Sequence, residues 1–217
     1  MKNALKPHEA AERVADGSTL MIGGFMGVGS PHRMINALVE RAPTDLTLIA
    51  NDTAQPGNGI GKLITAGLIK RLITSHIGLN PETQQKMISG EIDVELSPQG
   101  TLVERIRAGG MGLGGILTAT GLGTPVDEGK PVVDVKGVTY LIETPLRADF
   151  ALIAANEADY VGNLNYSLTA QNFNPIMALA ADTVIAEAQT IVPVGVIPPD
   201  SVRTPGVLVS HILERAA

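Results

Sequence analysis

A glycine-rich segment near the amino terminus has the composition of an anion-binding loop. Its residues, in order, are Gly23, Gly24, Phe25, Met26, Gly27, Val28 and Gly29. Ser30-Pro31 follows and predicts a helix start, with Ser as N-cap and Pro as the first helical residue. A glycine loop that leads into a helix can present backbone N–H groups to an anion or a developing oxyanion. From the spacing alone, a simple tight turn explains the glycines equally well.

Two carboxamides are candidate donors to a substrate carbonyl. Asn51 follows an apolar run at 46–50, and Gln99 follows another at 94–97. Neutral amides donate hydrogen bonds to carbonyl oxygens. Parallel sheets bind ligands beyond the carboxyl ends of their strands, so these amides and the glycine segment share one rim if their strands are neighbours. Loop capping is the commoner role for any single Asn or Gln.

Several other patterns do not support a nucleotide or metal site. The glycines at 110–115 match a dinucleotide fingerprint, but they follow a predicted helix and lead into none. The segment at 56–63 lacks the first glycine and the Ser or Thr of a phosphate-binding loop. The four histidines are far apart and show no metal-ligand spacing. We expect no metal and find no activated nucleophile paired with a base.

Alternating strands and helices must position these residues. Apolar runs predict strands at 19–22, 46–50, 68–75, 94–97, 150–154, 183–186 and 207–212. Helical spacing predicts helices from Ser30-Pro31 up to Pro43 and at 80–88, 101–107 and 175–181, the third ended by Gly109-Gly110. A tight turn at Lys136-Gly137 predicts a hairpin of 132–135 with 138–142. The pattern favours an α/β fold, an open, mainly parallel sheet flanked by helices, with the hairpin as an antiparallel insertion.

Composition limits the class of protein further. The 217 residues suit a single domain spanning 1–217, and 44% hydrophobic with 18% charged residues is the balance of a packed core. A net charge of −6 argues against nucleic acid as a partner. There are no cysteines, and no apolar run reaches the roughly 18–20 residues of a membrane helix. With no apolar leader at 1–17, we expect a cytoplasmic protein without a membrane partner.

The segment DGSTLMIGGFMGVGSP at 16–31 resembles the amino-terminal signature of family I coenzyme A transferases. LTLIANDT at 46–53, the stretch 73–110 and NFNPIMALAAD at 172–182 resemble the same family, in particular alpha subunits that act on acetate, acetoacetate and other 3-oxoacids. The resemblance covers nearly the whole chain. It implies a coenzyme A transferase-like fold and a ping-pong reaction through a glutamyl-CoA thioester.

The resemblance also implies how the site is divided between chains. The family's glutamate lies in a Ser-Glu-Asn-Gly motif that this sequence lacks, so we expect it on a partner beta subunit, in an α2β2 assembly. The glycine segment at 23–29 maps to coenzyme A binding, and Asn51 and Gln99 map to contacts with the thioester carbonyl. Asp52 replaces an asparagine found in some relatives. Coenzyme A is expected as a substrate rather than as a permanently bound cofactor, together with acyl-CoA and a short-chain carboxylate.

Two alternatives remain at this stage. One is a binding module that keeps the fold without chemistry, and the other is a sugar-phosphate isomerase of related architecture with its own acid and base. Under the transferase interpretation, Gly24 and Gly27 are expected to be small because a ligand approaches the backbone closely.

Overall fold

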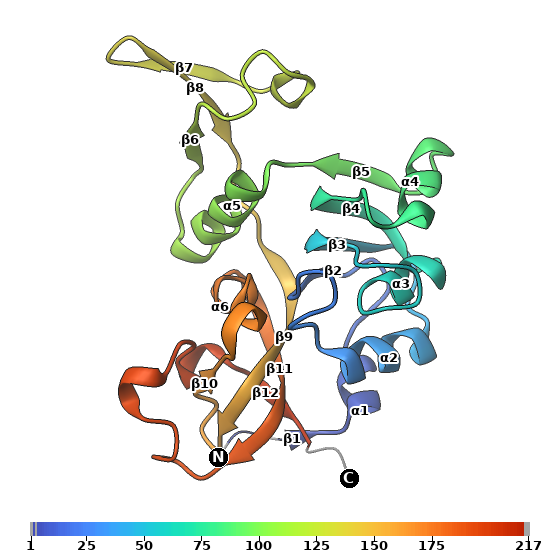
Figure 1. The fold of residues 1–217 in the computed structure, drawn as a ribbon, viewed down its shortest axis with the longest axis vertical. Helices are drawn as coiled ribbons and strands as arrows, with labels where there is room; N and C mark the ends of the chain where they lie inside the picture. The colour runs from blue at the N-terminus through green and yellow to red at the C-terminus, as the bar shows by residue number, and fades with distance from the viewer. Residues whose placement is uncertain (1, 3, 215–217) are drawn as a thin grey trace.

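Two sheets of unequal size organise the chain, of which the computed structural model describes residue 2 and residues 4–214 (Figure 1). The strands of the larger sheet, in spatial order, are β1 (Ala4–Leu5), β12 (His211–Leu213), β11 (Ala181–Val192), β9 (Ala148–Asp159), β2 (Thr19–Ile22), β3 (Leu46–Asp52), β4 (Ile69–His76) and β5 (Asp93–Leu96). All neighbours along this path are parallel, and β10 (Leu164–Asn165) pairs antiparallel with β9. The predicted mainly parallel sheet is confirmed. Residues 1, 3 and 215–217 of the predicted domain lie outside the described residues.

Helices cover both faces of this sheet because alternate strand residues point to opposite sides. Leu20 and Ile22 belong to the core on one face, and Met21 belongs to the core on the other. The first face is covered by α1 (Pro7–Ala11), α2 (His32–Arg41), α3 (Gly61–Thr65) and α4 (Pro81–Ile88). The second is covered by α5 (Gln99–Met111) and α6 (Asn174–Met177) (Figure 1). Each fully buried Leu or Ile in these layers contributes roughly 1.5–3 kcal/mol.

The helix predicted at 80–88 is confirmed, but the end predicted for the next helix is wrong. Asn80 caps α4 through hydrogen bonds from two backbone N–H groups. Helix α5 runs through Gly109 and Gly110 and ends at Met111, followed by Gly112 as the C-cap with φ of 70°. A Cβ on Gly109 would lie 1.9 Å from the carbonyl oxygen of Leu146. These two glycines therefore permit close packing of the helix rather than ending it.

The carboxyl-terminal part departs most from prediction. Strands β9 and β11 have 12 residues each, so the predicted runs at 150–154 and 183–186 cover only part of them, toward their amino-terminal ends. The segment predicted as one strand at 207–212 is divided between the 3₁₀ turn η4 (Gly206–Leu208) and β12. Helix α6 is shorter than predicted, and α1, α3, β1 and β10 were not predicted. The remaining 3₁₀ turns are η1 (Pro125–Asp127), η2 (Leu168–Gln171) and η3 (Pro199–Ser201).

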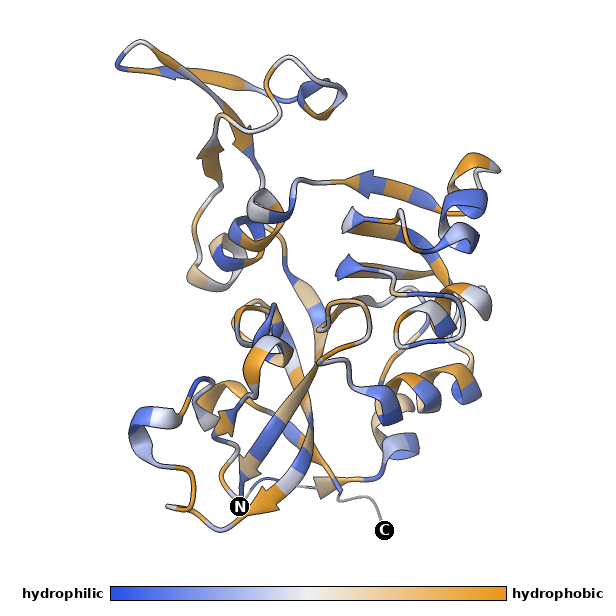
Figure 2. Cartoon of the chain, in the orientation of Figure 1, coloured by the Kyte–Doolittle hydropathy of each residue, from blue (hydrophilic) through white to orange (hydrophobic). Residues whose placement is uncertain are grey.

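The smaller sheet projects from the body (Figure 1) and contains β6 (Ile116–Thr118), β8 (Val138–Glu143) and β7 (Val132–Val135) in that spatial order. The predicted hairpin is confirmed, with Lys136 and Gly137 both at positive φ in its turn. The sheet has apolar residues along its strands in Figure 2. Leu117, Val132 and Val138 are about half exposed.

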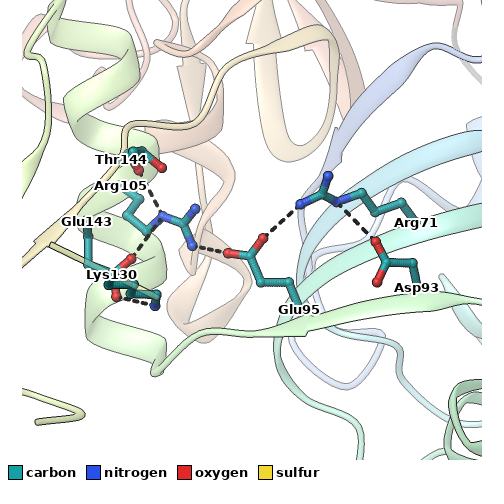
Figure 3. Close-up of polar contacts among 7 residues, drawn as sticks. All are labelled: Arg71, Asp93, Glu95, Arg105, Lys130, Glu143 and Thr144. Carbon is teal, nitrogen blue, oxygen red and sulfur yellow. Dashed lines mark hydrogen bonds and ion pairs between the residues drawn. The ribbon is translucent and has the colours of Figure 1, made fainter. Parts of the chain in front are cut away.

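A chain of ion pairs joins the base of this sheet to the body (Figure 3). Arg105 of α5 is buried and lies 2.6 Å from Glu95 of β5 and 3.7 Å from Glu143 of β8. Lys130 contacts Glu143 at 2.6 Å, and Arg71 contacts Glu95 at 3.1 Å. Because Arg105 also donates to the carbonyl of residue 144, its charge and its hydrogen bonds fix α5 against both sheets.

Candidate functional site

Residues 23–29 form a tight hairpin between the end of β2 and the start of α2. Phe25 and Val28 exchange two backbone hydrogen bonds of 2.9 Å, and Met26 and Gly27 form the tip. Both tip residues have positive φ, 51° and 87°, as a two-residue type I′ turn requires. The backbone N–H groups of Phe25 and Val28 therefore bind within the hairpin and are closed to a ligand.

The glycines of this hairpin are required by the chain's own packing. Gly24 has φ of 131°, and a Cβ there would lie 2.0 Å from the hydroxyl oxygen of Ser30. Gly27 has φ of 87°, and a Cβ there would lie 2.8 Å from the side-chain nitrogen of Asn58. Backbone conformation and neighbouring side chains already account for a glycine at both positions, and the close approach of a ligand stays a prediction.

Two asparagines at the start of α6 hold the hairpin from one side: Asn172 precedes the helix and Asn174 is its first residue. Asn172 accepts the N–H of Gly24 at 3.1 Å and donates to the carbonyl of Val28 at 3.0 Å. Asn174, which is fully buried, donates to the carbonyl of Gly29 at 2.9 Å. Both lie within the segment 172–182 that carried part of the resemblance, but no spacing in the sequence connects them to the glycines.

The amino terminus of α2 is occupied by a carboxylate of the chain itself. Glu187 of β11 accepts the backbone N–H groups of Arg33 and Met34 at 3.0 Å each. The helix begins at His32, and its first flanking residue, Pro31, provides no side-chain cap. The prediction of Ser30 as the capping residue is therefore wrong, and this helix end is not an open anion site. A glutamate in a strand far along the chain gives no sequence signal for this role.

Asp52, Asn51 and Gln99 form a continuous hydrogen-bonded chain beside the hairpin. Asp52 Oδ2 accepts the N–H of Met26 at 3.0 Å and the amide of Asn51 at 2.8 Å. Asn51 Oδ1 in turn accepts from Gln99 Nε2 at 2.7 Å and from the Ser75 hydroxyl at 3.2 Å. Asn51 and Asp52 are buried in the last residues of β3, whereas Gln99 is exposed at the start of α5. The prediction that the glycine segment, Asn51 and Gln99 lie on one rim of the sheet is confirmed.

A cavity of about 460 Å³ opens at this rim. Its lining residues are Phe25, Asn51, Gln99, Gly100, Val103, Arg107, Gln171, Asn172, Phe173, Pro175 and Ile176. They include neutral amides, apolar side chains and one cation, and none is Asp or Glu. Arg107 is paired with Glu104 at 2.9 Å on the same helix. Such a lining suits a carbonyl or carboxylate group and offers it no nucleophile of its own.

A second cavity of about 410 Å³ lies on the other side of the hairpin tip. Gly27, Val28 and Gly29 contribute to its wall together with Glu187 and Tyr166. Burial raises the pKa of the Tyr166 phenol, which bonds the Thr204 hydroxyl at 2.6 Å and stays neutral at physiological pH. The hairpin therefore separates the two cavities.

The part of the chain that the structure describes has neither a cluster of metal ligands nor a membrane-spanning helix. No three His, Cys, Asp or Glu side chains gather there as metal ligands. No helix among these residues has both the length and the apolar composition to cross a bilayer. His32 Nε2 donates to the Gly27 carbonyl, 3.0 Å away, and so belongs to the hairpin.

The fold and the rim define an α/β protein with its candidate site at the carboxyl edge of a parallel sheet. Residues 5–215 match the family described as coenzyme A transferase. The acetate CoA-transferase subunit alpha of Escherichia coli (strain K12) is 56% identical over 198 residues, which are 91% of this chain and 90% of that subunit. The acetoacetyl-CoA:acetate/butyrate CoA transferase alpha subunit of Clostridium acetobutylicum is 52% identical, over 93% of both chains. This chain belongs to the coenzyme A transferase family.

Solved structures agree with this assignment. An acyl-CoA transferase from Escherichia coli O157:H7, in a thioester complex with CoA, has a TM-score of 0.89 at 25% identity, over 98% of this chain and 47% of that one. This chain thus spans about half the length of that transferase. A chain of the decarboxylase AibA/AibB has a TM-score of 0.82 at 27% identity, over 100% of this chain and 84% of its own length.

Proposed function

We propose that this chain is the alpha-type subunit of a two-chain coenzyme A transferase, which moves coenzyme A between an acyl-CoA and a short-chain carboxylate or 3-oxoacid. The observation that carries the proposal is the 460 Å³ cavity, which gathers amides and a cation but no carboxylate. The reaction needs a glutamate nucleophile, which we place on a beta subunit in a cytoplasmic α2β2 assembly. The high identity to subunits named alpha supports this division.

In the proposed reaction, coenzyme A is transferred through two covalent intermediates on the partner's glutamate. The partner's glutamate attacks the thioester carbonyl, the C–S bond breaks, and an acyl-glutamyl anhydride and a CoA thiolate result. The thiolate then attacks the glutamyl carbonyl, which releases the first carboxylate and leaves a glutamyl-CoA thioester. The second carboxylate reverses both steps. In each attack negative charge develops on a carbonyl oxygen, and a fixed N–H donor lowers the barrier most at that point.

In this chain we assign that donor role to Gln99. One N–H of its amide is used by Asn51, and the other is left for a substrate oxygen. Asn51 is only 1% exposed, and its oxygen and one N–H are engaged by its own chain. A direct substrate contact by Asn51 stays a prediction and requires its second N–H.

The hairpin tip is proposed to contact coenzyme A or the partner chain. The side chains of Phe25, Met26 and Val28 are 44%, 42% and 51% exposed. Three exposed apolar side chains on a rigid turn between two cavities form a surface that a thioester arm or a second chain can cover. No coenzyme is proposed to stay bound between turnovers.

The test is reconstitution of activity from two chains. We expect the purified chain alone to be inactive and to gain acyl-CoA:carboxylate transfer when it is co-expressed with a family beta chain that carries Ser-Glu-Asn-Gly. Gln99→Ala should then lower kcat about 10- to 1,000-fold with little change in KM, as loss of one transition-state donor does. Robust transfer by the isolated chain, or a Gln99→Ala complex with wild-type kinetics, would contradict the proposal.

The same assay separates the other candidates. A binding module would bind acyl-CoA and never transfer it. A decarboxylase, which the likeness to AibA/AibB makes the relevant enzymatic alternative, would release carbon dioxide without a carboxylate acceptor. An isomerase needs an acid and a base in its cavity, and no Asp, Glu or His is found among the lining residues of the rim cavity.

A further inference from the structure

We propose that Asp52 is a positioning residue that fixes, through Asn51, which atoms of the Gln99 carboxamide face the 460 Å³ cavity. The kinetic part of this inference rests on the proposed function. The structural part does not, because it concerns only the direction of the hydrogen bonds within the chain.

The direction begins at Asp52. Its Oδ1 accepts the N–H of Ala54 at 2.7 Å, and its Oδ2 accepts from Asn51 Nδ2 at 2.8 Å. The N–H of Met26 lies 3.2 Å and 3.0 Å from the two oxygens. Both oxygens thus face nitrogen donors, so this group acts here only as an acceptor. It is 4% exposed, and water contributes little to its satisfaction.

An acceptor at this place determines the orientation of both amides. The oxygen and nitrogen of a carboxamide have nearly the same shape, so the partners decide which way it points. Asn51 must turn its NH₂ to Asp52 and therefore its oxygen to Gln99. Gln99 must turn its NH₂ to that oxygen, 2.7 Å away. Its own oxygen and its second N–H are then the atoms left for the cavity, and no described residue hydrogen-bonds to that oxygen.

Asp52→Asn isolates this effect. The oxygen of Asn at position 52 keeps the N–H of Ala54 at 2.7 Å and that of Met26 at 3.2 Å, whereas the 3.0 Å contact of Met26 with Oδ2 is lost. Its NH₂ takes the place of Oδ2 and faces the NH₂ of Asn51. Two donors at 2.8 Å cannot pair, so Asn51 reverses and presents NH₂ to Gln99. Gln99 then reverses as well and exposes a different set of atoms to the substrate.

Exchanging the two side chains restores the original direction. In Asn51→Asp with Asp52→Asn, the carboxylate at 51 accepts from the amide at 52, from Ser75 and from Gln99. Asn51→Asp alone instead places two buried carboxylates face to face at the position of a 2.8 Å contact. The effect of Asn51→Asp must therefore change sign, harmful when residue 52 is Asp and beneficial when it is Asn.

Thermal melting of the purified protein tests the structural part. We expect Asn51→Asp to lower Tm by at least about 5 °C in the wild-type background. It should raise Tm when added to Asp52→Asn. If Asn51→Asp lowers Tm both in the wild type and in Asp52→Asn, the inference is overturned. This result does not depend on whether the protein is a transferase.

Kinetics of the reconstituted complex test the link to Gln99. Asp52→Asn should lower kcat about 10-fold or more, and the exchanged pair should recover it to within about 3-fold of wild type. With Ala at position 99, Asp52→Asn should change kcat by less than about 3-fold, because there is no amide left to reverse. An equal loss with Gln or Ala at 99 would show that Asp52 acts only on the hairpin and would overturn the proposal.

Discussion

The cap on α2 provides the most direct test of how β11 supports the glycine hairpin. Glu187 accepts two backbone N–H groups at 3.0 Å, and its side chain is 14% exposed. Loss of an N-cap acceptor costs about 1 kcal/mol, and loss of a partly buried charge at a helix amino terminus costs up to about 1 kcal/mol more. Glu187→Ala should therefore reduce the free energy of unfolding by about 2 kcal/mol, which lowers Tm by about 4–8 °C in a chain of this size.

Glu187→Gln separates the two contributions, since it keeps one acceptor oxygen and removes the charge. We expect about half of the Tm loss, measured by circular dichroism melts. Glu40→Ala is the matched control, because Glu40 is exposed on the same helix and near its carboxyl end, where a negative charge gives no stabilisation. A Glu187→Ala protein that melts within about 1 °C of wild type would refute this account of the helix start.

Two further outcomes follow from the contacts described above. Gly27→Ala should lower Tm more than Gly57→Ala, because both have positive φ but only Gly27 has a neighbour within 4 Å of the added Cβ; equal losses would mean that Asn58 simply moves away. Burial raises the pKa of Glu95, but the hydrogen bond and charge of Arg105, and then those of Arg71, outweigh it and hold this pKa below its ordinary 4.5. The ionised form is thus favoured by folding, so the stability that Glu95 contributes is present above pH 4.5 and lost as the pH falls through the lower folded pKa. The Tm values of wild type and Glu95→Gln should differ at pH 7 and converge in acid. A Tm difference that grows in acid would contradict this direction of the pH dependence.

The central strands and the rim were predictable because the information is local. Short apolar runs that end in polar residues located β2 to β5, and the parallel-sheet rule then placed Asn51 and Gln99 on one edge. The hairpin at 132–142 was equally local, since the Lys136-Gly137 turn fixes its register.

The contacts that hold the site were not predictable because they join distant parts of the chain. Asn172 reaches the glycine hairpin, and Glu187 reaches the start of α2, across more than 140 residues, and neither has a spacing that reveals its partner. The local sequence predicts Ser30 as the cap of α2, but the tertiary structure places Glu187 there. The local sequence likewise predicts a helix end at Gly109, although the close approach of Leu146 is what requires this glycine.

The small sheet leaves the body and returns to it at adjacent points. Ile116, at the start of β6, is paired with Glu143, at the end of β8. The two ends of the small sheet are therefore paired with each other. The length of this sheet can change between homologues without moving β9 relative to β2. Among the described residues, the pairing of Arg105 with Glu143 is the only ion pair that crosses the base of this sheet. A homologue that loses Glu143 together with the sheet would have to replace Arg105 as well, because a buried arginine is destabilising once one of its two carboxylate partners is gone.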